Sequence, residues 1–571
     1  MKILSLHCDY IKFKPLKKAL KSAELTKEEE KEKKVNEALV ILTAVEKGDN
    51  ENSVKLLVKN IEDIAKQVNA KNIVLYPYAH LSSELASPEL AVDILKSTEK
   101  ELKKNKKLKI KRAPFGYYKE FELKCKGHPL SELSREIKAD GEVEEESNRE
   151  ELLRKMTKLH MSAPRGKNNL KSNVELGREL DIYIVSEIVG KGLPLFTPKG
   201  TTIKREIEKF IVNEELKRGY EYTSTPVMAK SDMYKISGHW QHYKDSMFIL
   251  DVGNERFALR PMTCPFQFIL FKRKPRSYKD LPKKYAEISY LFRNEQSGEL
   301  RGLTRVRQFT LADAHIICTS NQLEKEFEKV LDLIKYVMKT LGVKDIWYRF
   351  SKWDPKDKGK KYIDNPKAWD ASQKSMKKIL DKLKVEYTEA DGEAAFYGPK
   401  LDIQYKDVYG KEDTLITIQI DFALPEKFDL TYKDEKNKIR RPMVIHRSST
   451  GATERMIAYL LEKNQGSLPL WLSPIQVRVL SFTTRNKNSA EKLCEKLNQE
   501  GIRADLDIED KTVQNKVREA ELQHIPYIIV IGDKEEKSKT LAVRERGKKL
   551  KFGVKETEFI EEIKEKINNK T

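Results

Sequence analysis

The sequence predicts a multidomain protein that combines α/β and α+β architecture. At 571 residues the chain is long enough for about three or four domains of roughly 150 residues each. Short β-rich runs alternate with helical patterns in the first part, and long amphipathic helices with antiparallel-type strands follow. After Pro469 the chain restarts with a new alternation of strand and helix patterns. We therefore predict domains at 1–138, 173–468 and 469–571, with a linker at 139–172.

Composition and charge describe a globular chain with an unusually ionic surface. Hydrophobic residues make up 39% and charged residues 35% of the chain, and the formal net charge is +21. No apolar run approaches the length of a membrane span, and the first residues reach Asp9 too soon for a signal peptide. We expect a cytoplasmic protein with no membrane partner. The positive charge favours a polyanionic partner such as nucleic acid, although Lys and Glu enrichment is also typical of proteins from hot environments.

The five cysteines predict no disulfide framework, because their number is odd and the chain is long. They lie at positions 8, 125, 264, 318 and 494. A metal ligand among them remains an option.

The N-terminal domain is predicted as α/β. Its expected strands are 2–8, 38–45, 72–76 and 121–125, and its clearest helix is 53–68. The segment 100–112, KELKKNKKLKIKR, has eight basic residues and one acidic residue. This pattern fits an RNA-backbone surface, and it also fits a solvated helix end followed by a strand.

The central domain is predicted from a change of periodicity. A helix stripe of Ile203, Ile207, Phe210 and Ile211 follows the cap candidates Thr201 and Thr202. The strand 415–421 alternates, so Thr417, Gln419 and Asp421 share a polar face. A helix at 451–462 carries Arg455 near its N-terminal end, where an anion would be stabilised.

The stretch 289–318 is predicted as a hairpin that carries much of the chemistry. One strand ends at Arg293, a polar loop covers 294–302, and a second strand runs over 304–318. Three guanidiniums, those of Arg293, Arg305 and Arg307, would meet there and favour phosphate. Period two then places one set of side chains on a pocket wall: Phe309, Leu311, Asp313, His315 and Ile317. The chain has no GxxxxGK[ST] loop and no convincing GxGxxG, so separated arginines would hold a nucleotide.

Three residues far apart in the sequence raise the question of a metal site. Cys264, His315 and His446 have no zinc-finger spacing, and spacing alone favours a core cysteine with two structural histidines. If they converge, they form the Cys-His-His pattern with an open position that is typical of catalytic zinc. His239 and His242, three residues apart, are either further ligands or part of a polar turn.

The C-terminal domain is predicted as a compact α/β unit. Its expected strands are 477–482, 527–531 and 541–544, its expected helices include 489–498 and 512–523 with a fourth strand between them, and a turn is expected at Gly532 and Asp533.

Six segments, in order and in spacing, resemble threonyl-tRNA synthetases: SGHWQHYKDSMF, RPMTCPF, FRNEQSGELRGLTRVRQFTLADAH, AAFYGPKLDI, TIQIDF and VIHRSSTGATERMI. The match as a whole runs from about residue 173 to the C-terminus. It contains the three class II motifs, marked here by Pro226, the Arg293 hairpin and the Arg455 helix. The resemblance implies a class II antiparallel catalytic sheet, a C-terminal anticodon-binding domain and a homodimer formed through the first motif.

The first 138 residues resemble the editing domain of archaeal-type members, which is similar to D-aminoacyl-tRNA deacylases. The matching segments are LYPYAHLSSEL, RAPFGYYKEF and CKGHPLSELSR. The resemblance implies hydrolysis of mischarged seryl-tRNA by this domain. The implied editing residues are Ala79, His80, Phe115, Tyr118, Lys119 and Glu132.

In the catalytic domain the resemblance implies roles for individual residues. Cys264, His315 and His446 would bind one Zn²⁺ per subunit. The implied ATP residues are Arg293 at the α-phosphate, Arg455 at the γ-phosphate, Glu295 near the adenine amino group, Phe309 stacked on the base, and Arg305. The implied threonine residues are Met262, Asp313, Tyr397 and Gln419, and the residues at the reacting groups are Arg293, Arg455 and Lys400. Glu535 and Arg544 would read the anticodon.

The implied activity is ligation of L-threonine to tRNA(Thr) with ATP and Mg²⁺. Valine lacks the hydroxyl and would be rejected by roughly 10⁴ or more, whereas serine lacks only a methyl group, worth about 1 to 3 kcal/mol. Serine therefore requires the second, hydrolytic site. Two alternatives are a non-catalytic RNA-binding or regulatory protein on a synthetase scaffold, and a deacylase with an RNA-docking remainder.

Overall fold

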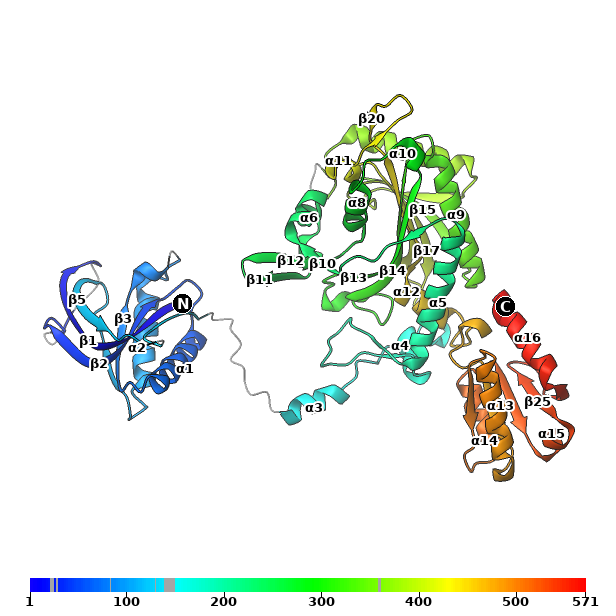
Figure 1. The fold of residues 1–571 in the computed structure, drawn as a ribbon, viewed down its shortest axis with the longest axis horizontal. Coiled ribbons are helices and arrows are strands. Elements are labelled where there is room, and N and C mark those ends of the chain that lie inside the picture. The colour runs from blue at the N-terminus through cyan, green and yellow to red at the C-terminus, as the bar shows by residue number, and fades with distance from the viewer. Residues whose placement is uncertain (21–24, 27–28, 83, 129, 138–148, 358–360) are drawn as a thin grey trace. The chain divides into compact units, whose positions relative to one another are not determined.

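The structure is a computed structural model that describes residues 1–20, 25–26, 29–82, 84–128, 130–137, 149–357 and 361–571. By its internal contacts the chain divides into two compact units, Met1–Glu151 and Leu152–Thr571. Figure 1 shows that each unit has its own sheet and helices. Within the described residues, no helix is both long enough and apolar enough to cross a membrane. All five cysteines are free.

The first unit is an α/β sheet with helices, as predicted. Its strands are β1 (Lys2–Lys18), β2 (Lys33–Ala44), β3 (Asn72–Pro77), β4 (Lys109–Arg112), β5 (Tyr117–Cys125) and β6 (Glu132–Glu136). The order is β4-β3-β2-β1-β5, with β6 also paired to β1. Strands β2, β3 and β4 are parallel, whereas β1 is antiparallel to its neighbours. The nearly continuous apolar run 38–44 in β2 is typical of a strand that is covered on both faces.

Two helices cover the central parallel strands of this sheet. They are α1 (Glu51–Gln67) and α2 (Pro88–Leu102), and their apolar stripes pack into one core with β2 and β3. Helix α1 begins at a reciprocal cap between Asn50 and Ser53, and α2 begins at Ser87 with Pro88 in its first turn.

The second unit is built on an eight-stranded, mostly antiparallel sheet, which confirms the predicted architecture. Its order is β16-β15-β17-β18-β21-β14-β13-β9. The strands are β9 (Glu221–Tyr222), β13 (Lys283–Phe292), β14 (Gln308–Cys318), β15 (Trp347–Ser351), β16 (Tyr387–Ala390), β17 (Lys400–Lys406), β18 (Glu412–Asp421) and β21 (Met443–Ala452).

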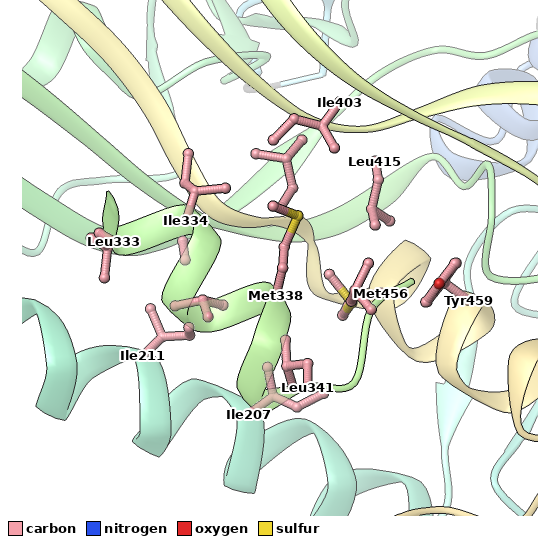
Figure 2. Close-up of a cluster of buried hydrophobic side chains, with 14 of the residues drawn as sticks. Ile207, Ile211, Leu333, Ile334, Met338, Leu341, Ile403, Leu415, Met456 and Tyr459 are labelled. Atoms are coloured by element: carbon pink, nitrogen blue, oxygen red, sulfur yellow. The ribbon is translucent and has the colours of Figure 1, made fainter. Parts of the chain in front are cut away.

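Several helices pack on this sheet around one apolar core, including α5 (Pro198–Lys217), α9 (Leu323–Thr340) and α12 (Thr453–Lys463). Figure 2 shows Ile207, Met338 and Met456, one residue from each helix, converging with Ile403 of β17 and Leu415 of β18. Because this face of the sheet is filled by helices, the opposite face is left for chemistry.

Shorter elements complete the central region. The helices are α3 (Arg149–Thr157), α4 (Asn173–Glu179), α6 (Ser231–Ser237), α7 (His239–His242), α8 (Cys264–Lys272), α10 (Pro366–Lys382) and α11 (Leu424–Lys427). The strands are β7 (Tyr183–Ile184), β8 (Leu195–Phe196), β10 (Met228–Lys230), β11 (Ile249–Val252), β12 (Glu255–Leu259), β19 (Tyr432–Lys433) and β20 (Ile439–Arg440).

The start of α5 differs from the prediction of Thr201 and Thr202 as caps. Thr197 is the N-cap, and its hydroxyl accepts a hydrogen bond from the Gly200 N–H at 3.3 Å. Pro198 fits the first helical turn because its missing N–H is not needed there. Gly200 is required, since a Cβ at that position would lie 2.0 Å from the Ile182 carbonyl oxygen. The sequence shows the apolar stripe, but the predicted cap lies about one turn after the observed one.

The C-terminal region is α/β, as predicted, and its own core lies against a sheet of five strands, one more than expected. The strands are β22 (Val477–Ser481), β23 (Ala504–Asp507), β24 (Tyr527–Ile531), β25 (Thr540–Glu545) and β26 (Lys551–Lys555), in the order β23-β22-β24-β25-β26. Helices α13 (Lys487–Gln499), α14 (Val513–Leu522), α15 (Asp533–Ser538) and α16 (Glu556–Asn569) accompany them. The expected turn at Gly532 and Asp533 is instead the start of α15. The Glu535 carboxylate accepts the Gly532 N–H at 3.1 Å, which stabilises that first turn.

Candidate functional site

Four predicted site residues form a row across four neighbouring strands. Lys400 of β17 is the register partner of Gln419 of β18, Gln419 is the partner of His446 of β21, and His446 is the partner of His315 of β14. Directly opposite residues in antiparallel strands point to the same side of a sheet. The row therefore forms one wall. Of the face predicted for β14, Phe309, Leu311, Asp313 and His315 line the cavity, whereas Ile317 is buried in the apolar cluster beside α8.

The predicted metal ligands converge. The ligand atoms of Cys264, His315 and His446 all lie within 4.8 Å of one another, and all three side chains are buried. Cys264 comes from the start of α8, so the three residues reach the site from three different elements. Among the residues that the structure describes, no other group of this kind is found, and His239 and His242 belong to none.

Neighbouring polar groups fix the orientation of both imidazoles. His315 Nδ1 lies 2.6 Å from Gln267 Oε1, and His446 Nε2 lies 2.8 Å from Asp421 Oδ2. Because both partners are acceptors, these two nitrogens carry the protons, and the opposite ring nitrogens keep their lone pairs for a metal. Burial also lowers the pKa of His315, which favours the neutral, ligating form. One thiol and two oriented imidazoles fit Zn²⁺.

A carboxylate and a phenol stand beside the metal ligands. Asp313 lies two residues before His315 on the same face of β14, and burial raises its pKa to about 6. The Tyr397 hydroxyl donates a hydrogen bond to Gln419 Oε1, and its ring lies 5.1 Å from that of His446. This end of the site can therefore recognise a small ligand with hydroxyl or amino groups.

The other end of the site is suited to an anion. The guanidinium of Arg293 lies 4.9 Å from the centre of the Phe309 ring, and its buried Nε has no hydrogen-bond partner among the described residues. A buried donor without a partner is costly, so a ligand that supplies an acceptor would be stabilised there. Phosphate oxygens match the planar donor set of Arg.

Further charged side chains in this region are held by protein partners. Arg305 bonds Glu295, with Nε and Nη2 at 2.9 and 2.7 Å. Arg455 donates to the carbonyl oxygens of Thr304 and Thr414. Lys400 Nζ lies 3.0 Å from Asp402, which also accepts bonds from Ser351 and Thr417. These contacts fix the positions of the three cationic side chains before a ligand binds.

One cavity of about 330 Å³ joins the two ends. Every residue predicted for the catalytic site lines it: Met262, Cys264, Arg293, Glu295, Arg305, Phe309, Asp313, His315, Tyr397, Lys400, Gln419, His446 and Arg455.

The predicted hairpin is confirmed, with two differences. Strand β14 begins at Gln308 rather than at residue 304, because the Arg301 carbonyl accepts the N–H groups of Thr304 and Arg305 in a turn. Arg307 does not line the cavity. Its guanidinium donates to the carbonyl oxygens of Glu295 and Lys191 instead.

Some functional partners were missed in the sequence, although signals for two of them were present. Gln267 lies three residues after Cys264, on the same face of α8, and Asp421 shares the polar face of β18 with Gln419. No pattern in the sequence indicates that Arg447 belongs to the site. It lines the cavity, is 1% exposed, and donates from Nη1 to Glu215 of α5 at 2.7 Å.

The first unit contains a separate cavity of about 500 Å³. Five of the six residues predicted for editing line it: Ala79, His80, Phe115, Tyr118 and Lys119. Glu132, in contrast, is exposed on β6, where it pairs in register with Leu6, and does not line the cavity.

Lys119 is the notable charged group in this cavity. Its ammonium donates to the carbonyl oxygens of Pro114 at 3.0 Å and Tyr117 at 3.1 Å, and lies 5.1 Å from the centre of the Tyr76 ring. Burial lowers its pKa to about 8. A cation held by neutral groups is available to a negatively charged or developing anionic group of a ligand.

In the part of the chain that the structure describes, no hydrogen bond or ion pair joins Glu535 to Arg544, the two residues predicted for anticodon reading. Glu535 caps α15 and lines a shallow cavity of about 310 Å³ with lysines of α13. Arg544 of β25 pairs with Glu521 at 2.6 Å and does not line that cavity.

Comparison with known proteins links these regions to one family. Residues 1–137 match the archaea-specific editing domain of threonyl-tRNA synthetase, residues 243–464 the class II core domain of the G, H, P, S and T synthetases, and residues 476–566 an anticodon-binding domain. A threonine--tRNA ligase of Clostridium perfringens is 52% identical over 400 residues, which are 69% of this chain. The match spans 62% of that relative's own length.

Solved structures agree with these matches. The RNA-binding domain of threonyl-tRNA synthetase from Cryptosporidium parvum is 34% identical, with a TM-score of 0.66, and the match covers 69% of this chain and 98% of that one. A prolyl-tRNA synthetase from the same organism, bound to L-proline and AMP, has a TM-score of 0.54 at 14% identity over 70% of this chain and 75% of that one, which indicates a shared fold. With a class II core, an anticodon-binding domain and an archaea-specific editing domain on one chain, this protein belongs to the threonyl-tRNA synthetase family.

Proposed function

We propose that this protein joins L-threonine to tRNA(Thr) with ATP and hydrolyses seryl-tRNA(Thr) in its N-terminal unit. The observation that carries the proposal is the single cavity in which the Cys264, His315 and His446 cluster shares a wall with Arg293 and Arg455. A metal-binding end and an anion-binding end within one cavity suit an amino acid and a nucleotide that react with each other.

At the nucleotide end, the proposed roles follow from the side chains. Arg293 would bind the α-phosphate with its unpaired Nε, and Phe309 would stack on the adenine. Arg305 and Arg455 would bind the outer phosphates, with Mg²⁺ accompanying ATP, and Glu295 would accept the adenine amino group. The threonine carboxylate would then attack the α-phosphorus, and pyrophosphate would leave. Positioning and charge neutralisation supply most of the catalysis in such a transfer.

At the amino-acid end, Cys264, His315 and His446 would hold one Zn²⁺. When bound, the ion would supply an open coordination position for the amino and hydroxyl groups of threonine. Asp313 would accept the hydroxyl proton in a hydrogen bond, and Tyr397, Gln419 and Met262 would limit the size of the side chain. Valine would leave Asp313 without its partner, which is the kind of mismatch that gives large discrimination.

Lys400 would act at the edge where the two substrates meet. Its contact with the buried carboxylate of Asp402 holds the ammonium on the cavity wall. From that position it would stabilise negative charge that develops during the transfer.

Serine satisfies the same polar groups as threonine, so some tRNA would be charged with serine. The cavity in the first unit would remove it by hydrolysis. We propose that Ala79, His80, Phe115, Tyr118 and Lys119 bind the 3′ end of seryl-tRNA there and that the cavity excludes the extra methyl group of threonine. Glu132 lies outside the cavity lining and would contribute to editing only from a distance. The water would be activated with help from the terminal ribose hydroxyl of the tRNA.

The remaining proposals concern organisation and partners. We propose an editing domain at 1–138, a linker at 139–172, a catalytic domain at 173–468 and an anticodon-binding domain at 469–571, with Glu535 and Arg544 at the anticodon. A homodimer is supported by exposed apolar side chains next to Pro226 of the first motif, Val227 at 41% and Met228 at 40% exposure. A cytoplasmic location is supported by the five free cysteines.

The decisive experiment is amino-acid-dependent ATP-pyrophosphate exchange with threonine, serine and valine side by side. We expect strong exchange with threonine, weaker exchange with serine and almost none with valine. An absence of threonine-dependent exchange would exclude the ligase. A deacylase on an RNA-docking scaffold would hydrolyse seryl-tRNA in the same preparation without any exchange, and a purely regulatory RNA-binding protein would do neither.

A further inference from the structure

A cluster of lysines on the first unit has no role in either cavity. We call Lys106, Lys107, Lys109 and Lys111 the β4 lysine surface. All four side chains are exposed. None forms an ion pair with any residue that the structure describes, which sets them apart from other basic residues nearby.

The adjacent basic residues have acidic partners. Lys103 pairs with Glu99 at 2.7 Å, Lys104 with Glu101 at 2.6 Å, and Arg112 with Glu99 at 2.8 Å. The segment 100–112 is therefore divided. Lys103, Lys104 and Arg112 are neutralised within the protein, whereas the middle of the segment presents uncompensated positive charge.

The fold places this charge on an edge. Strand β4 is the last strand in the sheet order and pairs with β3. Lys109 and Lys111 are two residues apart on β4, so they project from the same face, and Lys106 and Lys107 precede them in the turn that enters the strand. The four ammonium groups thus follow one border of the unit.

This border leads to the editing cavity. The parallel strands β2 and β3 contribute their carboxyl ends to the cavity lining, through Thr43 and Tyr76. The chain that leaves β4 reaches the lining residue Phe115. From Lys109 to Phe115 the backbone spans at most roughly 20 Å. Lys109 and Lys111 therefore lie within reach of a nucleic acid whose end enters the cavity, and Lys106 and Lys107 lie further along the same border.

We propose that the β4 lysine surface binds the phosphate backbone of the tRNA acceptor stem while the 3′ end occupies the editing cavity. The inference rests on the proposed editing function, which requires an aminoacylated 3′ end in that cavity. Exposed lysines without acidic partners are the groups that exchange condensed counterions for phosphate contacts. Such contacts fix the position of an RNA without reading its sequence.

The same lysines have a simpler explanation, which the experiment must distinguish from tRNA binding. Lysines on an exposed edge strand hinder pairing with the edge of another sheet. That role requires no RNA, and it predicts that replacement of the lysines promotes self-association and leaves tRNA binding unchanged.

The test uses the full chain and two charge-matched triple variants. The first replaces Lys107, Lys109 and Lys111 with Gln. The control replaces Lys55, Lys59 and Lys66 with Gln. These are exposed residues of α1 that form no ion pair with any described residue. Single-turnover deacylation of seryl-tRNA is measured against protein concentration at several salt concentrations, together with threonylation.

In the first variant we expect the protein concentration at half-maximal rate to rise by about tenfold at low salt, with the rate at saturation unchanged. The logarithmic dependence of affinity on salt should become shallower by about two to three, close to 0.9 for each lost phosphate contact. The control variant and the threonylation rate should match the unmodified protein. An unchanged salt slope, or equal losses in both variants, would overturn the proposal.

Failure of the editing function itself would be distinguishable. If the unmodified protein does not hydrolyse seryl-tRNA, the proposed editing function is wrong, and so is the reason given for tRNA at β4. The salt dependence of binding to uncharged tRNA then supplies an independent outcome. A slope that is equal in all three proteins would exclude phosphate contacts at the β4 lysine surface.

Discussion

His315 and His446 face each other across β14 and β21, with their ring centres 4.5 Å apart and their planes perpendicular. Each ring is held from behind by a different residue, Gln267 or Asp421. The pair therefore presents two lone pairs toward the Cys264 thiol. This relationship connects the metal end of the cavity to the register of the sheet.

Removal of the thiol should abolish metal binding. For Cys264→Ala, we expect loss of bound zinc and of threonine-dependent exchange, because two imidazoles alone bind zinc weakly. Metal content per chain, measured by mass spectrometry after dialysis, provides a readout that does not depend on activity. Cys494→Ala is the matched control, since Cys494 is a buried cysteine of the C-terminal core. Retention of stoichiometric zinc in Cys264→Ala would contradict the assignment of the ligand.

Loss of the charge behind His446 should weaken the metal without removing a ligand. Asp421 Oδ1 accepts the N–H groups of Ala423 and Leu424, and Oδ2 bonds His446. Asp421→Asn can keep the first two bonds but loses the carboxylate behind the imidazole. We expect zinc affinity to fall by about 10- to 100-fold in a competitive chelator titration. Asp402→Asn, which affects the Lys400 contact instead, should leave that affinity unchanged.

The editing activity should depend on the charge of Lys119. The pKa of Lys119 is lowered to about 8, so its ammonium is present below that pH and is lost above it. We expect the enzymatic deacylation rate to fall as pH rises through about 8, after subtraction of spontaneous ester hydrolysis.

Two variants at this position test the explanation. Lys119→Met should lose most of the deacylation activity at every pH and allow seryl-tRNA to accumulate. Lys119→Arg keeps its charge throughout this range, so any activity that it retains should show no fall near pH 8. A fall of equal size in the Arg variant would assign the titration to another group.

The buried ion pair between Glu215 and Arg447 should be important for stability. Both side chains are almost fully buried, and Glu215 also accepts bonds from Ser449 and Tyr222. Glu215→Ala would leave the Arg447 charge buried without a partner, which costs about 3 to 5 kcal/mol.

Tryptophan fluorescence during urea unfolding can measure this loss. All five tryptophans lie in the second unit, so the signal reports on that unit alone. Glu255→Ala removes an exposed pair with Lys230 and should change the free energy of unfolding by less than about 1 kcal/mol. A similarly small effect of Glu215→Ala would show that water or a rearrangement compensates the buried guanidinium.

Local patterns in the sequence were sufficient to predict much of the fold. The alternation around Gln419 and around His315 identified two strands and the faces that line the cavity. The helical stripe that includes Ile207 identified α5, but not its start, because three threonines in the region are all suitable caps and only the path of the chain near Ile182 selects Thr197.

Long-range pairing could not be predicted from local patterns. Nothing near His446 in the sequence indicates that it pairs with His315, and spacing alone left the metal site open. Resemblance to a family supplied that connection. Arg447 illustrates the remaining gap, since a lone arginine in a polar stretch carries no sign that it will be buried against a glutamate of a distant helix.

The row of side chains across β17, β18, β21 and β14 also bears on how the protein folds. A shift of one residue in any of these strands would turn its member of the row to the helix-covered face. Cys264, His315 and His446 are separated by 51 and 131 residues, so they come together only after β21 has paired with β14 and α8 has packed beside them. Zinc uptake would therefore follow this long-range pairing, and a chain that has acquired the ion is one in which β14 and β21 have found their correct register.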